Sequence, residues 1–121
     1  MIFKVENMLN EKNIKPLISI GITSFNSEKT ISKAINSAIN QSWPNKEIII
    51  VDDNSTDNSW NIIQEISHNK SNFHLYKHIE NKGVAYARNT IIKKANGKFI
   101  VFFDDDDESN INRIYLQFLK I

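Results

Sequence analysis

Five consecutive acids follow an apolar segment near the C-terminal end of the 121-residue sequence. Residues 100–103 are all apolar, and Asp104 to Glu108 follow them directly. Adjacent carboxylates repel one another and raise each other's pKa unless a cation neutralises them. Hard divalent cations prefer carboxylate oxygens, usually one or two from the protein together with substrate phosphates. The run therefore indicates either a metal and diphosphate site or a solvated acidic loop that leads into a helix, and the run alone does not separate the two.

Two other polar clusters also follow apolar segments. Residues 52–57 (Asp-Asp-Asn-Ser-Thr-Asp) come directly after a β-branched run, and residues 23–28 follow the first apolar segment. Within the cluster at 52–57, Ser55 or Thr56 is expected to cap a helix, whereas Asp53 has no obvious structural duty. Its carboxylate could accept the imide N–H of a uracil ring.

The apolar pattern alternates between a two-residue and a 3.6-residue period along the chain. It predicts the order β-α-β-α-β-α-β-α, in which strands joined by helices pair in parallel with right-handed crossovers. We therefore expect an α/β fold with an open, mostly parallel sheet and helices on both faces. The predicted strands cover 17–23, 47–51, 72–77 and 100–103, and the predicted helices lie near 31–39, 57–68, 84–95 and 111–119.

Several details of this prediction can be checked directly. The strand over 100–103 should be buried on both faces, and Val84 and Ile92 should lie on the buried side of the third helix. Because the carboxyl ends of parallel strands lie at one edge of a sheet, the three polar clusters should meet there. The three histidines fall in no motif and are expected to be surface residues.

Composition narrows the class of protein. The net charge is +1, so no global field favours nucleic acid or an anionic membrane, and no nucleic-acid partner is expected. The absence of cysteine excludes disulfides and thiolate metal sites. No apolar run approaches the roughly 18 residues of a membrane span. Residues 1–15 form a polar leader that could be a short helix or disordered, residues 16–121 form the fold, and a cytoplasmic location is the default.

Phosphate binding through a glycine-rich helix start is not indicated, because neither G-x-G-x-x-G nor a Walker sequence is present. Four segments, in order and at fitting spacing, instead resemble the nucleotide-sugar-binding part of family 2 glycosyltransferases, which have the GT-A fold. The resemblance covers 16–121, and the segments that carry it are 16–26, 50–57, 81–89 and 103–107.

The resemblance implies roles for matching residues. Asp104 and Asp106 correspond to the two acids of the family's D-x-D motif and would hold Mn²⁺ or Mg²⁺, with Asp107 as a possible support. Asp104 could contact the ribose instead, and the register within the four aspartates is open by one position. The expected nucleotide-binding residues are Thr23, Asn26, Glu28, Asp52, Asp53, Gly83, Arg88, Asp104 and Asp105. Among these, Thr23 and Asp53 would hold the base, and Asp52 would shape the loop.

The implied activity is an inverting, metal-dependent transfer of a sugar from a nucleotide sugar, with UDP as the first choice. The acceptor would be a hydroxyl of a saccharide or lipid-linked molecule, as in polysaccharide or glycoconjugate synthesis, and the enzyme could sit at the inner face of the membrane. The resemblance places the catalytic base beyond Ile121, so this length of chain is expected to bind a donor without turnover. An uncovered sheet edge would then favour self-association.

Two other functions remain to be weighed. The chain could be a non-catalytic nucleotide-binding module, which calorimetry with UDP and Mn²⁺ would separate from an inert fragment. A phospho-receiver domain is a remote alternative, because residues 48–53 resemble that fold's first strand and acid pair. In a receiver the pair should open the domain, whereas here a complete strand and helix precede it.

Overall fold

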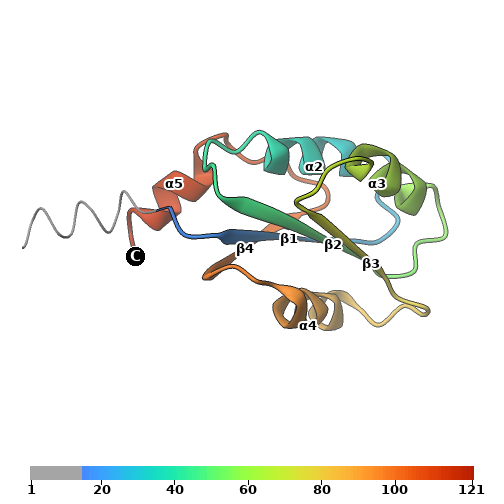
Figure 1. The fold of residues 1–121 in the computed structure, drawn as a ribbon. Coiled ribbons are helices and arrows are strands. Elements are labelled where there is room, and N and C mark those ends of the chain that lie inside the picture. Colours follow the sequence, from blue (N-terminus) through green and yellow to red (C-terminus); the bar gives the residue numbers. More distant parts are fainter. Residues whose placement is uncertain (1–14) are drawn as a thin grey trace, which may run out of the picture.

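A computed structural model describes residues 15–121. Of the predicted leader, only Lys15 lies within the described residues. The chain forms one four-stranded sheet in the order β3-β2-β1-β4, and all neighbouring strands are parallel (Figure 1). The strands are β1 (Ile18–Ser24), β2 (Lys46–Asp52), β3 (Phe73–Lys77) and β4 (Phe99–Asp104). The helices are α2 (Ile31–Ile39), α3 (Ser59–Ser67), α4 (Val84–Lys94) and α5 (Arg113–Phe118). The predicted order and α/β class are confirmed.

The helices cover both faces of the sheet. Figure 1 shows α2 and α3 on one face and α4 on the other. In β2, Ile48 and Ile50 pack in the core of the first face, which also holds Ile114 of α5, whereas Ile49 and Val51 pack against α4. Successive side chains of a strand point to opposite faces. Burial on both faces therefore explains why the segment is continuously apolar.

Helix α4 lies close to the sheet where β1 carries a glycine. A Cβ atom at Gly21 would lie 2.7 Å from Cγ2 of Ile91. Only Ala87 and Ile91 of α4 are buried, so the contact with the sheet is a narrow stripe. The predicted burial of Val84 and Ile92 is wrong, because they are 56% and 52% exposed beside that stripe.

Strand β4 is less buried than predicted. Only Phe103 of this strand is buried, residues 99–102 are half-buried, and Asp104 is exposed. The reason is its position: among the described residues, β4 pairs only with β1 and forms one edge of the sheet, while β3 forms the other. The prediction of an uncovered edge is thus confirmed for the described part of the chain.

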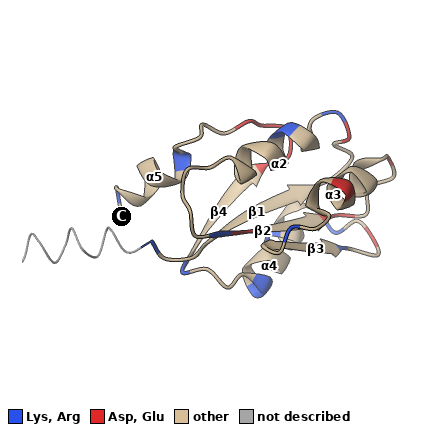
Figure 2. Ribbon diagram, turned by 45° about the horizontal axis from the view of Figure 1, so that its top comes forward, with Lys and Arg blue, Asp and Glu red and all other residues tan. Residues whose placement is uncertain are grey.

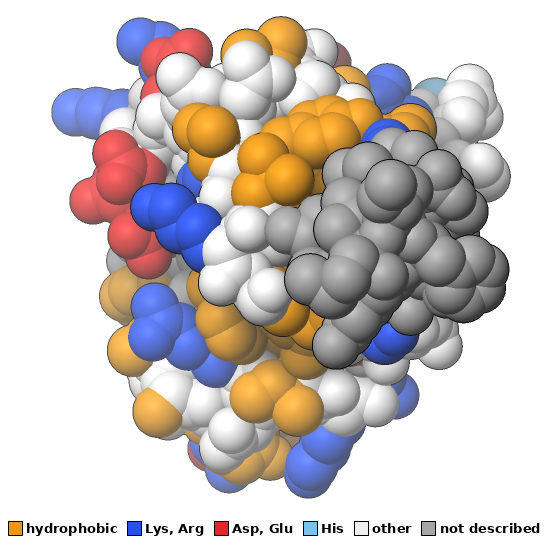
Figure 3. Space-filling view, turned by 90° about the vertical axis from the view of Figure 1, so that its left-hand side faces the viewer, with side chains coloured by type: hydrophobic (Ala, Val, Ile, Leu, Met, Phe, Trp, Pro, Cys, Tyr) orange, Lys and Arg blue, Asp and Glu red, His pale blue; other side chains and the backbone are white. Residues whose placement is uncertain are grey.

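Exposed apolar side chains gather at the end of the molecule that carries α5 (Figure 3). Leu116, Leu119 and Ile121 are each more than half exposed there. Within residues 15–121, no helix is both long enough and apolar enough to cross a bilayer. Self-association through this end or through the open strand edge stays a prediction.

The parallel register sets the positions of the polar clusters. Ser24 is paired with Asp52, and Thr23 is paired with Asp104. The loops that follow β1, β2 and β4 therefore start at the same end of the sheet, where these strands have their carboxyl ends, as the sequence predicted. Figure 2 shows the acidic segment after β4 as one continuous red stretch, whereas Lys and Arg are spread over several elements.

Candidate functional site

A cleft of about 560 Å³ opens at the carboxyl ends of β1, β2 and β4. This volume lies within the range of small-molecule sites. Asp53 from the cluster at 52–57 and Asp104 to Asp106 from the acidic run line the same cleft, although some fifty residues separate them in sequence. Its lining residues are Thr23, Ser24, Phe25, Asp53, Asn81, Gly83, Val84, Ala87, Asp104, Asp105 and Asp106.

The loops after β1 and β2 are tied together beside the cleft. Asn26, which has a positive φ of 46°, accepts a 2.8 Å hydrogen bond at Oδ1 from the amide of Thr56. Glu28 accepts a 3.0 Å bond from the amide of Asn58. Asn26 and Glu28 were expected near the nucleotide, but neither lines the cleft, and their contacts hold the two loops in register.

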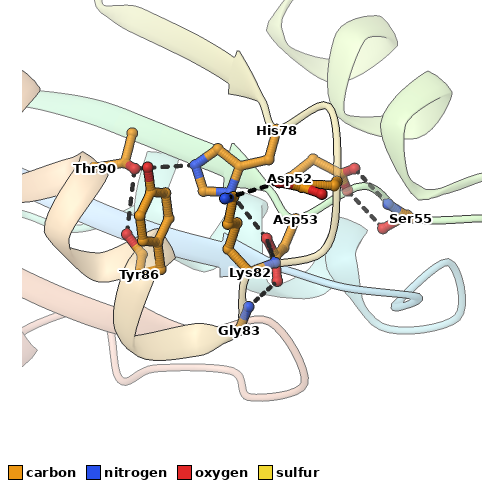
Figure 4. A network of polar contacts seen from close by, with 9 residues as sticks. Asp52, Asp53, Ser55, His78, Lys82, Gly83, Tyr86 and Thr90 are labelled. Atoms are coloured by element: carbon orange, nitrogen blue, oxygen red, sulfur yellow. Dashed lines mark hydrogen bonds and ion pairs between the residues drawn. The ribbon is translucent and has the colours of Figure 1, made fainter.

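Asp52 shapes the loop that follows β2, as expected. It is fully buried, and its carboxylate accepts bonds from both the amide (2.9 Å) and the hydroxyl (2.6 Å) of Ser55 (Figure 4). Ser55 is therefore not the cap of the next helix. That helix begins at Ser59, whose amide and hydroxyl both donate to Asp57, and Asn58 stands at its N-cap position.

Asp53 lies at the wall of the cleft and is 4% exposed. Its Oδ1 accepts hydrogen bonds of 2.9 Å from Nδ1 of His78 and from the amide of Lys82, and its Oδ2 accepts one of 2.8 Å from the amide of Gly83 (Figure 4). Burial alone would raise the pKa of this carboxyl, but these bonds and the charge of His78 outweigh it and lower the pKa. Asp53 therefore has the structural duty that the sequence did not indicate: it anchors the loop before α4.

Gly83 allows the chain to meet Asp53. It has a φ of 92°, a backbone conformation that residues with a side chain rarely adopt, and it stands at the N-cap position of α4. No atom lies within 4 Å of a Cβ built there, so backbone conformation, not space, requires glycine.

His78 is not the surface residue that the sequence predicted. Its side chain is 13% exposed, and both ring nitrogens have partners, Asp53 at Nδ1 and the Thr90 hydroxyl at Nε2 (3.0 Å). The ring also meets Tyr86 edge to face, with centroids 5.3 Å apart. Nothing in the sequence marks this pairing, because 25 residues separate His78 from Asp53.

The acids after β4 differ in their surroundings. The Asp104 carboxylate is largely exposed and lies 3.7 Å from Nη2 of Arg88, whose guanidinium lies over the ring of Phe102. Asp105 accepts a 3.1 Å bond from the amide of Phe25, and burial together with the charge of Asp106 raises the pKa of Asp105. Asp106 is exposed at the cleft, whereas Asp107 is exposed outside its lining.

A divalent ion fits this arrangement only together with a ligand. Among residues 15–121 no group of three or more His, Cys, Asp or Glu side chains is arranged to hold a metal. Two exposed carboxylates, those of Asp104 and Asp106, do face the cleft. Because Mg²⁺ commonly takes one or two protein carboxylates and completes its shell with phosphates and water, these donors suit an ion that arrives with a diphosphate.

Phe25 is a residue of the cleft that sequence reasoning missed. Its ring is 47% exposed although it lines the cleft. An exposed aromatic ring in a cavity offers a flat surface for stacking. The signal available in the sequence was a single aromatic residue in an otherwise polar turn.

The family model for glycosyl transferase family 2 matches residues 19–121. The chain belongs to this family. The resemblance to family 2 is thus confirmed, and the phospho-receiver alternative is excluded.

Curated family 2 relatives include two glucosyltransferases from Escherichia coli. The chain is 44% identical to WfaP over 91 residues, and 41% identical to WfgD over 101 residues. Both are named UDP-Glc:alpha-D-GlcNAc-diphosphoundecaprenol beta-1,3-glucosyltransferase. The aligned part covers 75% and 84% of this chain but 36% and 39% of the relatives, so the chain spans less than two fifths of their length.

Solved structures give the same fold. The S. aureus TarS fragment 1-349 in complex with UDP-GlcNAc matches with a TM-score of 0.76 and 34% identity, over 83% of this chain and 29% of that one. A mannosyltransferase from Pyrobaculum calidifontis, in complex with GDP-Man and Mn²⁺, matches with a TM-score of 0.74 at 21% identity, over 88% and 34% of the two chains. The second likeness concerns the fold alone.

Proposed function

We propose that this chain is the donor-binding region of a metal-dependent, inverting glycosyltransferase that uses a UDP-sugar. The observation that carries the proposal is that Asp53, Asp104 and Asp106 line the same cleft. A nucleoside diphosphate has a base at one end and charged phosphates at the other, and the cleft offers matching chemistry at its two sides. The names of WfaP and WfgD, which specify UDP-Glc, support UDP as the nucleotide.

The base would lie between Phe25 and Asp53. Stacking on the exposed ring of Phe25 would hold the plane of the base, and the carboxylate of Asp53 would accept its N–H. Thr23 lines the same cleft beside Asp104, and its hydroxyl is available for a polar atom of the nucleoside. This assignment favours a uracil ring, because its imide N–H is the only hydrogen-bond donor of any kind on its pairing edge.

The diphosphate would lie near the acids after β4. Asp104 and Asp106 would hold Mn²⁺ or Mg²⁺, and Arg88 would donate to a phosphate oxygen from α4. When bound there, such an ion would neutralise negative charge on the nucleoside diphosphate. Arg88 does not itself line the cleft, but it adds positive charge 3.7 Å from Asp104, with its guanidinium over the ring of Phe102.

The acceptor is proposed from the relatives and not from the cleft. The names of WfaP and WfgD specify a diphosphoundecaprenol acceptor. A hydroxyl of a saccharide carried on such a lipid is therefore the proposed acceptor here, in the synthesis of a polysaccharide or glycoconjugate. An acceptor of this kind would bring the enzyme to the inner face of a membrane.

Isothermal titration calorimetry with UDP, with Mn²⁺ or with EDTA, tests the proposal. We expect UDP to bind tightly only with the metal, and Asp106→Asn to remove that difference. Equal UDP affinity with and without metal would overturn the metal site, and no UDP binding in either condition would overturn the nucleotide site.

A further inference from the structure

Helix α4 alone covers its face of the sheet among the described residues, and no other element of that part of the chain lies over its outer side (Figure 1). Only Ala87 and Ile91 of the helix are buried against the sheet. The helix and the turns at its two ends form a basic segment, because residues 82–98 contain five Lys or Arg and no Asp or Glu. All five basic residues are exposed. Figure 2 shows Lys and Arg, but no acid, on α4.

The small net charge of the chain hides this separation of charge. The whole sequence carries +1, whereas residues 82–98 carry +5, so the rest of the chain carries −4. Salt screens electric fields beyond a Debye length of about 10 Å at 0.1 M, so a partner that lies against the surface responds to the local charge and not to the total. The outer side of α4 therefore attracts an anionic partner, although the chain as a whole does not.

Three of the five bases have no acidic partner. Two pair with carboxylates, whereas Lys93, Lys94 and Lys98 have no carboxylate partner in the described part of the chain. Nζ of Lys94 lies 5.1 Å from the ring centroid of Tyr76, a contact that leaves its charge uncancelled. The three lysines lie where α4 ends and the chain turns into β4, so their charges gather at one place. Lysines in the last turn of a helix also suit the negative end of its dipole, but this effect does not account for Lys98, which lies beyond the helix.

An apolar side chain lies beside these lysines. Ile92 is about half exposed, and it follows the buried Ile91 by about 100° around the helix, which turns it away from the sheet. One exposed isoleucine is ordinary on a protein surface. Beside unpaired lysines, however, it matches the pattern of helices that lie in the interface of a bilayer, where apolar side chains enter the acyl boundary and lysines meet anionic lipids.

A lipid surface fits this patch better than a nucleic acid does. Sites for single-stranded nucleic acid combine a positively charged groove with aromatic rings on which bases stack. The outer side of a helix is convex, and the exposed ring of α4, Tyr86, lies against His78 near the other end of the helix. The proposed acceptor favours a lipid as well, because it is lipid-linked and α4 begins at the cleft, where Val84 is part of the lining. A bilayer against α4 would bring such an acceptor close to the donor.

We propose that the C-terminal half of α4 and the turn after it dock this chain on an anionic lipid surface, with Lys93, Lys94 and Lys98 against the lipid phosphates and Ile92 in the interface. The choice of a lipid rests in part on the proposed function, in which the acceptor is lipid-linked. The inference goes beyond that function because it names the surface that meets the membrane. None of the four residues lines the cleft, so donor binding does not depend on them.

Co-sedimentation with lipid vesicles tests the inference on the 121-residue chain. We expect the chain to bind vesicles of equal parts phosphatidylglycerol and phosphatidylcholine, but not vesicles of phosphatidylcholine alone. Binding should be lost in about 1 M salt, where the Debye length is about 3 Å. The double variant Lys93→Gln/Lys94→Gln should lower the partition coefficient about 25-fold, because each lysine near an anionic surface contributes a factor of about five. Ile92→Ser should lower it about fivefold, because less apolar surface is buried.

The matched control is the double variant Lys29→Gln/Lys33→Gln. It removes the same charge from the opposite face of the sheet, at α2 and the turn before it, and should change the partition coefficient less than about twofold. Glutamine forms a helix about as well as lysine, so both double variants should fold, which thermal unfolding checks. If Lys93→Gln/Lys94→Gln does not fold, Lys98→Gln in the turn decides, with an expected fall of about fivefold.

Four outcomes would overturn the inference: equal binding to the charged and uncharged vesicles, equal losses in the two double variants, an unchanged partition coefficient for Ile92→Ser, or binding of single-stranded RNA without binding of vesicles. Calorimetry with UDP keeps this result apart from the proposed function. A chain that binds UDP but not anionic vesicles overturns the docking surface alone. A chain that binds the vesicles but not UDP overturns the nucleotide site and leaves the docking surface in place.

Discussion

Nη2 of Arg88 in α4 lies 3.7 Å from Oδ1 of Asp104 at the end of β4, and both side chains are about half exposed or more. An exposed pair at this distance contributes little to stability, typically about 0–1 kcal/mol. The pairing thus has more consequence for the cleft than for the fold. It places one cation beside the acids that are proposed to hold the metal and the diphosphate.

Replacing Arg88 by alanine separates these two roles. We expect Arg88→Ala to lower the free energy of unfolding by less than about 1 kcal/mol, because the ion pair is solvated and the contact of the half-exposed guanidinium with Phe102 is weak. The same change should weaken UDP binding about tenfold, since a charge-assisted bond to phosphate is lost. Denaturant unfolding and calorimetry measure the two effects. Lys33→Ala, on α2 outside the cleft, is the control for net charge; an equal loss of affinity in both variants would contradict a specific contact.

Asp106 can be tested against a neighbouring acid outside the cleft. We expect Asp106→Asn to raise the Kd for UDP in Mn²⁺ at least about tenfold, towards the value in EDTA, because one of two carboxylate ligands is lost. Glu108→Gln removes the same charge two residues further on and should change the Kd less than about twofold, because Glu108 is exposed outside the lining of the cleft and is screened by salt. Should Glu108→Gln have the larger effect, the metal ligands would have to be reassigned along the acidic run.

Much of the fold could be predicted because its signals are local. The continuous apolar run of β2 and the helical stripe of α2 each appear within ten residues of sequence, and both elements were predicted nearly at their observed positions. Burial of β4 could not be predicted in the same way. Whether an apolar strand is central or at an edge depends on strand order, which the apolar pattern does not contain.

The candidate site was likewise predictable only in part. Convergence of Asp53 and Asp106 at one cleft followed from the parallel topology alone. The duties of Asn26, Glu28 and His78 did not, because each depends on a hydrogen bond to a residue 25 or more positions away. Local sequence indicates which side chains are polar, but only the fold indicates which partner each one meets.

Gly83 supplies a test of the loop that Asp53 anchors. Its φ of 92° and ψ of 164° are strained for any other residue, so we expect Gly83→Ala to destabilise the fold by about 1–3 kcal/mol. The loop would also shift away from Asp53 and weaken UDP binding. Lys82→Ala is the matched control, because it keeps the amide that bonds Asp53 and removes a surface ion pair with Glu80 and a contact with the Tyr86 ring. Equal unfolding midpoints for the two variants would show that the backbone is not strained there.

Glu47 stabilises the end of the sheet opposite the cleft. It is 5% exposed, and its carboxylate accepts bonds from the Ser19 hydroxyl and from the amide of Asn96, with His74 3.4 Å away. Burial alone would raise the pKa of Glu47, but these bonds and the charge of His74 lower it below its ordinary value of 4.5. The carboxylate therefore joins β1 and β2 to the turn between α4 and β4 in its charged form.

The effect of Glu47 on stability should depend on pH in a defined direction. A carboxyl whose pKa is lower in the folded state contributes stability above its unfolded pKa, and that contribution is lost as the pH falls through the folded pKa. We expect Glu47→Gln to lower the free energy of unfolding by about 2 kcal/mol at pH 7, the range of a buried charged hydrogen bond, and by progressively less below about pH 4. Urea unfolding at several pH values measures this difference, with Glu65→Gln on the exposed face of α3 as the control. A loss of stability that stays constant from pH 7 to pH 3 would mean that Glu47 acts through its shape and not its charge.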